Sequence, residues 1–127
     1  MALVMYHDEA CTQPVTAGAP DEVRQAVQSG QALTETREFW IKSDDALLTY
    51  EQVSITGVGD NNTPSANQID IKYSLTDGSY QDTLALADGN FEPTAVKIWR
   101  QVHCPEVTQA FNVTSITHQI TADEYVL

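Results

Sequence analysis

Three histidines, His7, His103 and His118, are the residues of this chain best suited to act as a general base. A Ser, Thr or Cys nucleophile would need such a base within hydrogen-bond distance. His103 precedes Cys104, but adjacent residues of a strand point to opposite faces of a sheet, so we predict a core cysteine and a surface histidine. His7 and Cys11 could meet only if the N-terminal segment folds back, which their spacing does not require. We therefore expect no catalytic residues and a protein that is not an enzyme.

Metal ligation is the second chemistry to consider. No pair of Cys or His residues has the spacing of a zinc site. Residues 60–62 and 88–90 begin with Asp60 and Asp88 and are rich in Asn and Gly, so their oxygen atoms could bind calcium. Neither segment has the ligand spacing of a helix–loop–helix calcium site, and ordinary turns use the same residues. We expect turns there and predict no metal site and no cofactor, with calcium binding by either loop left open.

Aromatic side chains offer a third possibility, which is recognition rather than catalysis. Tyr73 and Tyr80 are in phase with apolar neighbours and are predicted to pack in the core. Trp40 and Trp99 are out of phase with theirs. They could stack on a ligand, cover a second core layer or contact a partner subunit. We rank the partner first, because Trp and Tyr often anchor protein interfaces.

Composition limits the class of protein. The chain has 127 residues, enough for one domain with its own core, and a net charge of −12. Its six Lys and Arg residues are scattered singly, which disfavours binding to nucleic acid or to an anionic membrane. The N-terminus has no basic segment or long apolar run, so we expect cytoplasmic synthesis without a signal peptide. In that reducing compartment Cys11 and Cys104 are expected to be free thiols.

The elements that must position these residues are predicted to be strands. From Gln68 to Cys104 apolar and polar residues alternate, and the Asp-Gly turn at 77–78 predicts a β-hairpin. Arg100 falls on the apolar side of its strand, which implies a twist, a bulge or a buried ion pair. The last segment changes phase and is expected to contain a bulge or two short strands. The predicted strands cover 33–43, 50–56, 69–75, 80–87, 94–104 and 109–121.

One helix and an N-terminal arm complete the prediction. Pro20, the acidic pair that follows it and Gly30 are typical of the two ends of a helix, which we place near 21–29. Residues 1–19 are predicted to form an extended arm with one short strand, followed by a single domain over 20–127. About seven strands at regular spacing predict an all-β fold, an antiparallel β-sandwich.

Several of these segments resemble a known class of module. The runs 37–45 and 50–55, together with 96–100 and 3–8, are similar to paired strands of immunoglobulin-like modules in tailed-bacteriophage virion proteins. The resemblance implies a sandwich in a virion setting and no catalytic residues. Cys11 and Cys104 do not flank a core Trp at the antibody spacing, so a jelly-roll-like or other sandwich topology stays open.

The resemblance implies a non-enzymatic structural protein of a tailed-phage virion. We expect a capsid decoration or cement protein, or a tail or neck accessory protein, that packs on other virion structural proteins and on copies of itself. The alternative is a carbohydrate- or receptor-binding module, possibly calcium-assisted, in which a tryptophan stacks on a sugar. The residues expected at the interface are Leu3, Val4, Tyr6, Trp40 and Trp99.

Overall fold

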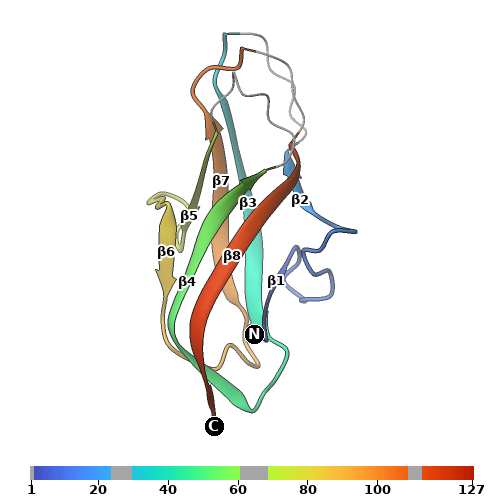
Figure 1. Ribbon diagram of the computed structural model, residues 1–127, viewed down its shortest axis with the longest axis vertical. Coiled ribbons are helices and arrows are strands. Elements are labelled where there is room, and N and C mark those ends of the chain that lie inside the picture. Colours follow the sequence, from blue (N-terminus) through green and yellow to red (C-terminus); the bar gives the residue numbers. More distant parts are fainter. Residues whose placement is uncertain (1, 24–29, 61–68, 109–112) are drawn as a thin grey trace.

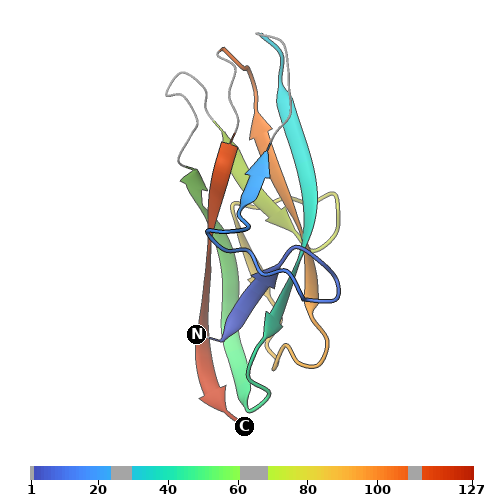
Figure 2. The same cartoon turned by 90° about the vertical axis from the view of Figure 1, so that its right-hand side faces the viewer.

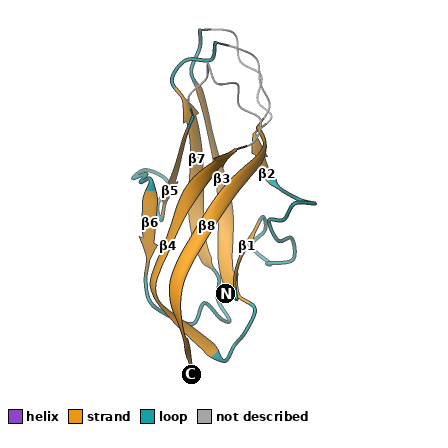
Figure 3. Ribbon diagram, viewed as in Figure 1, coloured by secondary structure: helices purple, strands orange, loops and turns teal. Residues whose placement is uncertain are grey.

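The chain folds into two packed β-sheets, seen in a computed structural model that describes residues 2–23, 30–60, 69–108 and 113–127 (Figure 1). The molecule is elongated, and both termini lie toward the same end. The described residues form strands and loops without a helix (Figure 3). The strands are β1 (Leu3–Tyr6), β2 (Asp21–Val23), β3 (Leu33–Ser43), β4 (Leu48–Asp60), β5 (Asp70–Ser74), β6 (Thr83–Leu86), β7 (Val96–Cys104) and β8 (Val113–Val126).

The strand order shows that successive strands alternate between the sheets. Sheet I has the order β1-β3-β7-β5, and sheet II has the order β2-β8-β4-β6. All paired strands are antiparallel. The predicted antiparallel β-sandwich is therefore confirmed. Its order differs from that of antibody domains, in which several consecutive strands are neighbours in one sheet.

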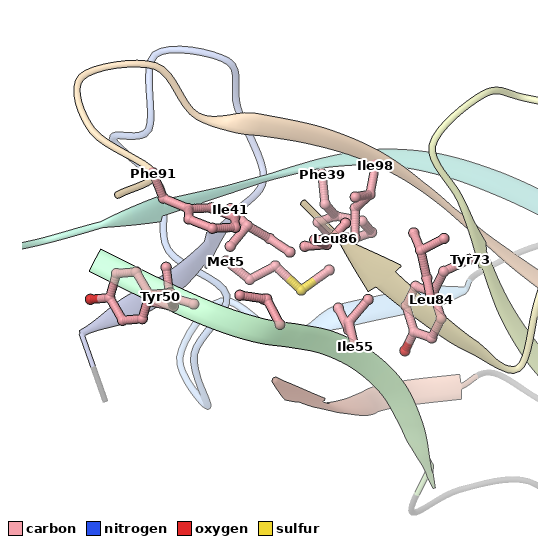
Figure 4. Packing of buried hydrophobic residues seen from close by; sticks show 12 residues of the cluster. Met5, Phe39, Ile41, Tyr50, Ile55, Tyr73, Leu84, Leu86, Phe91 and Ile98 are labelled. Carbon is pink, nitrogen blue, oxygen red and sulfur yellow. The ribbon is translucent and has the colours of Figure 1, made fainter. Parts of the chain in front are cut away.

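Apolar side chains from both sheets fill the space between them (Figure 4). Phe39 and Ile98 of sheet I face Ile55 and Leu84 of sheet II, and each is almost completely buried. Burying an aliphatic or aromatic side chain of this size contributes about 1.5–3 kcal/mol. A second, smaller cluster consists of Val23, Leu33, Val102, Cys104, Val107 and Ile116.

The helix predicted near 21–29 is wrong at its start. Asp21–Val23 form β2, which pairs with β8. Asp21, which had suggested the N-terminus of a helix, is fully buried, and its carboxylate accepts hydrogen bonds from Arg100. The pairing of β2 with β8 therefore outweighs the helix-start pattern at Pro20 and the acidic residues after it. The remainder of the predicted helix, 24–29, lies outside the described residues.

The extended N-terminal arm predicted over 1–19 is also not supported, although its short strand is present. β1 pairs with β3 from Leu3 opposite Ser43 to Tyr6 opposite Trp40. The following loop folds back, so that the Val15 amide donates to the Met5 carbonyl at 2.8 Å. The N-terminal segment is thus part of sheet I, because the inward side chains of β1 belong to the core.

The predicted hairpin is wrong in its pairing. β5 lies in sheet I and β6 in sheet II. Tyr73 of β5 forms an isolated bridge with Gln81, just before β6, through two backbone hydrogen bonds of 2.8 Å. The strands then separate, since Leu84 and Leu86 enter the core from the opposite sheet. The inward phase of Tyr73 is confirmed, whereas Leu75 is exposed.

The other predicted strands are present. β3 has the predicted bounds, and β7 begins two residues later than predicted. β4 extends beyond the predicted strand at both ends. The last segment is one long strand, β8, whose pairing with β4 shifts register twice, between Glu51 and Ser54 and between Gly57 and Gly59. Arg100 lies on the inner face of β7 in a buried ion pair, one of the three arrangements that the sequence left open.

Candidate functional site

The outer face of sheet I gathers the aromatic residues that the sequence placed out of phase. Trp40 of β3 lies between Tyr6 of β1 and Lys97 of β7 in the strand register. Two residues further along the same two strands, Glu38 lies opposite Trp99. Because side chains alternate along a strand, all five belong to the face that points away from the core. We call these five residues the aromatic face.

Lys97 links the two tryptophans. Its ammonium lies 4.6 Å from the ring centroid of Trp99 and 5.8 Å from that of Trp40. The same ammonium lies 3.0 Å from a carboxylate oxygen of Glu38. Cation–π contacts of this kind contribute about 0.5–1 kcal/mol at exposed sites. The lysine therefore contacts both tryptophan rings on the outer face of sheet I.

The structure unites most of the predicted interface residues. Val4, Tyr6, Trp40 and Trp99 are partly buried and point outward from β1, β3 and β7. Leu3 is the exception, because it points inward and belongs to the core. Reasoning from the sequence had not singled out Lys97 and Glu38. The sequence could have indicated Lys97, since it lies two residues before Trp99 on the same strand and therefore on the same face.

The aromatic face is suited to recognition. Its rings offer large, ordered contact areas, and its lysine and carboxylate largely cancel in charge. In the part of the chain that the structure describes, no three His, Cys, Asp or Glu side chains are grouped to hold a metal ion. The carboxylate of Asp88 accepts a hydrogen bond from the Gln52 amide of β4 at 3.1 Å, which connects the 88–90 loop to that strand. The Asp60 side chain lies outside the described part.

A second polar group of residues lies inside the sandwich. Arg100 of sheet I and Asp21 of sheet II are both fully buried. The Arg100 guanidinium donates to both Asp21 carboxylate oxygens, at 2.9 and 2.5 Å. It also lies 3.3 Å from Glu35. Such a two-point contact is among the stronger ion pairs, and here it connects the two sheets.

His118 extends this ion pair toward Tyr73. The His118 Nε2 lies 2.7 Å from the Asp21 carboxylate, and its Nδ1 lies 2.5 Å from the Tyr73 hydroxyl. A neutral imidazole would accept from the tyrosine and donate to the aspartate. We call Asp21, Tyr73, Arg100 and His118 the buried polar cluster.

The order carboxylate, imidazole, hydroxyl is that of a catalytic triad, but the hydroxyl is not activated. Burial raises the pKa of Tyr73 above its ordinary value, and the Asp21 charge raises it further. The Tyr73 side chain is also inaccessible to solvent. The arrangement is therefore suited to satisfying polar groups between the sheets.

The pKa of Asp21 reflects competing effects. Burial by itself raises this pKa, but hydrogen bonds from His118 and Arg100, together with the guanidinium charge, outweigh burial and hold it below its ordinary value. Sequence reasoning missed this partner of Arg100, since 79 residues separate the two.

The two cysteine thiols contact backbone carbonyls rather than histidines, Cys11 that of Glu9 and Cys104 that of Glu106. The prediction for the adjacent pair is confirmed, because Cys104 is in the core while His103 points outward and its ring contacts the Thr34 hydroxyl at 2.8 Å. His7 contacts the Ala19 carbonyl through Nε2 at 2.7 Å rather than Cys11. Both cysteines are free thiols.

Comparisons with protein-family models, with curated proteins and with solved structures found no match for this chain. Among the described residues, no helix is long and apolar enough to cross a membrane.

Proposed function

We propose that this protein is a non-enzymatic structural module that docks on a neighbouring protein through the aromatic face. One observation supports this most directly. Trp40 and Trp99 come from different strands yet meet around a single lysine on the outside of the sandwich. Tryptophans that are partly exposed and already ordered lose little conformational entropy on binding, which is why they often dominate interface energies.

The proposed setting is the virion of a tailed phage, with synthesis in the host cytoplasm. The sequence resemblance to immunoglobulin-like virion modules supports it, and an acidic sandwich is compatible with it. A net charge of −12 suits the outside of a capsid or tail better than an interior filled with phosphate. The partners would be other virion structural proteins and copies of this chain, in a capsid decoration, cement, tail or neck position.

Substitution of the tryptophans tests this proposal. Trp99→Ala and Trp40→Ala should each weaken assembly with shell or tail proteins by about 2 kcal/mol, roughly thirtyfold in affinity. Sedimentation velocity and calorimetry of the purified chain, alone and with each candidate protein, give the affinities. Tyr125→Ala is the matched control, because this exposed aromatic lies on β8 of the other sheet. Unchanged affinity in both tryptophan variants, with the fold intact by circular dichroism, would reject the proposal.

A carbohydrate- or receptor-binding module is the second candidate. Two tryptophans on one exposed face also resemble a platform on which sugar rings can stack. Calorimetry against a glycan panel, with and without calcium, distinguishes the two functions. Tight saccharide binding by the isolated chain that Trp99→Ala abolishes would replace the structural proposal with this one.

A further inference from the structure

One edge of β8 is left without a neighbour over much of its length. β4 pairs with β8 from Ile116 to Val126. On the opposite edge, β2 reaches only Ile116, which lies opposite Asp21. Beyond that point, no strand that the structure describes pairs with this edge of β8. Figure 2 looks onto this side of the molecule, where β2 covers only the upper part of β8.

An apolar groove of about 520 Å³ lies beside this open edge. β1 and the loop after it form one wall, and β8 forms the other. We call it the β1–β8 groove. Its lining includes Leu3, Met5, Val15, Ile116, His118 and Ile120.

The opposite side of the sandwich is different. There β5 is joined to the segment before β6 by the two backbone hydrogen bonds between Tyr73 and Gln81. On the groove side, Val15 bonds to the edge of β1, and the wall that faces it belongs to β8. On the groove side the Ala2 amide donates to the Glu124 carboxylate at 2.8 Å, and no backbone hydrogen bond between described residues joins β1 to β8.

An open strand edge above an apolar groove has the two features needed to bind an extended peptide. Every second residue of an antiparallel edge strand directs its N–H and C=O away from the strand with which it is already paired. A new strand can therefore add to that free edge. The side chains of the added strand alternate, so every second one can enter the groove.

Charge indicates which extended peptide would fit. The groove lining that the structure describes contains no Lys or Arg. Asp123 and Glu124 follow it further along β8, and the Glu124 carboxylate accepts a hydrogen bond from the Ala2 amide at 2.8 Å. All six basic residues of the chain lie elsewhere. The β8 strand of a second copy contains no Lys or Arg, so it would offer these carboxylates no complementary charge. A segment with Lys or Arg would be attracted.

We propose that the β1–β8 groove accepts an extended segment of a partner protein, in which apolar residues alternate with Lys or Arg, as an added strand on β8. This surface is separate from the aromatic face, so the inference does not depend on the function proposed above. The apolar residues would enter the groove, and the basic residues would lie near Asp123 and Glu124 further along β8.

A synthetic peptide tests this inference on the full chain. The probe is Lys-Val-Lys-Ile-Lys-Val-Lys, and the comparison peptide has the same composition with its lysines and apolar residues in separate blocks. The alternating peptide should bind at least about tenfold tighter, because only its periodicity suits a strand. It should also slow hydrogen exchange at residues 117–122. Equal affinity for the two peptides would overturn the inference, since binding would then depend on charge alone.

Charge reversal supplies the matched variants. The double variant D123K/E124K should reduce binding of the alternating peptide at least about tenfold. D70K/D82K changes the net charge equally and lies on the side of β5 and β6, so its affinity should stay within about twofold of the unaltered chain. Equal losses in the two variants would contradict a local site.

Two further results would also overturn the inference. Exchange protection that maps to β3 and β7 instead of β8 would place the peptide on the aromatic face. Self-association that protects residues 117–122 without peptide would identify a second copy as the occupant. Trp99→Ala should leave peptide binding unchanged, so failure of this inference and failure of the proposed function are distinguishable.

Discussion

At the scale of single residues, Arg100 organises the interior of the sandwich. It occupies an inward position in β7, where the alternating pattern would otherwise place an apolar residue. Its ion pair with Asp21 connects sheet I to sheet II. Removing two charges from water is costly, and the remaining hydrogen bonds to His118 and Glu35 help to offset that cost. The pair is thus sensitive to the loss of either member.

Arg100→Met should lower the free energy of unfolding by about 3–5 kcal/mol, because it removes the buried two-point partner of the Asp21 carboxylate and leaves only Arg37 at 4.0 Å. Urea denaturation provides the measurement. Lys42→Met is the matched control. The Lys42 side chain is 30% exposed and lies 3.6 Å from Glu92, so its loss should cost less than about 1 kcal/mol. Similar small losses in both variants would show that the buried pair contributes little.

The lowered pKa of Asp21 predicts how stability depends on pH. A carboxyl group whose pKa is lower in the folded chain stabilises it above the ordinary value of 3.8, and this contribution disappears as the pH falls through the folded value. Asp21→Asn should therefore make the free energy of unfolding fall less steeply between about pH 5 and pH 2.

Urea titrations at several pH values measure this slope. Asp123→Asn, which alters an exposed carboxylate on β8, should retain the steep acid dependence of the unaltered chain. An Asp21→Asn slope equal to that of the control would mean that the buried carboxylate does not account for acid sensitivity.

At the scale of elements, β4 and β5 approach each other across the sandwich at a glycine. A Cβ added to Gly57 would lie 2.8 Å from both Cβ and Cγ2 of Ile71, and 3.3 Å from the Tyr73 hydroxyl. β4 also changes its register with β8 beside this residue. The absence of a side chain therefore lets a strand of sheet II pass close to a strand of sheet I.

Gly57→Ala should destabilise the fold by about 1–3 kcal/mol, because the extra methyl group has to displace Ile71. Thermal denaturation followed by circular dichroism measures the effect. Gly78→Ala is the control, since a Cβ at that turn would meet no atom within 4 Å. If the two variants have the same melting temperature, the approach between the strands is not close enough to constrain residue 57.

The element scale also explains which predictions succeeded. The alternation in β3 and β7 depends only on neighbouring residues, so it placed Trp40 and Trp99 on the outer face and Cys104 in the core correctly. The Asp-Gly turn at 77–78 suggested a hairpin, but the same local pattern is compatible with a crossing between sheets. The choice depended on β7 and β4, the strands that β5 and β6 actually join.

At the scale of the whole molecule, the acidic composition affects stability as well as partner choice. A net charge of −12 on a chain of 127 residues implies self-repulsion in the folded state. Salt screens such repulsion between exposed charges, with a Debye length of about 10 Å at 0.1 M. The buried polar cluster is screened much less.

The melting temperature should therefore rise as NaCl increases from about 0.01 M to about 0.2 M, a range over which screening of surface charge strengthens. Differential scanning calorimetry at each concentration provides the measurement. The D123K/E124K variant is less acidic and should show a smaller rise. A melting temperature that falls with salt would indicate that attractive surface pairs outweigh the net repulsion.

The sequence by itself determined that the protein is an all-β sandwich, which residues face outward from β3 and β7, and that Arg100 needed special accommodation. These properties follow from a two-residue period, which is local. Only the tertiary structure decided that Asp21 neutralises Arg100, that β1 belongs to sheet I and that β8 has an open edge. Each of these depends on segments far apart in the chain, whose pairing is determined by burial and charge compensation across the whole sandwich rather than by the residues next to them.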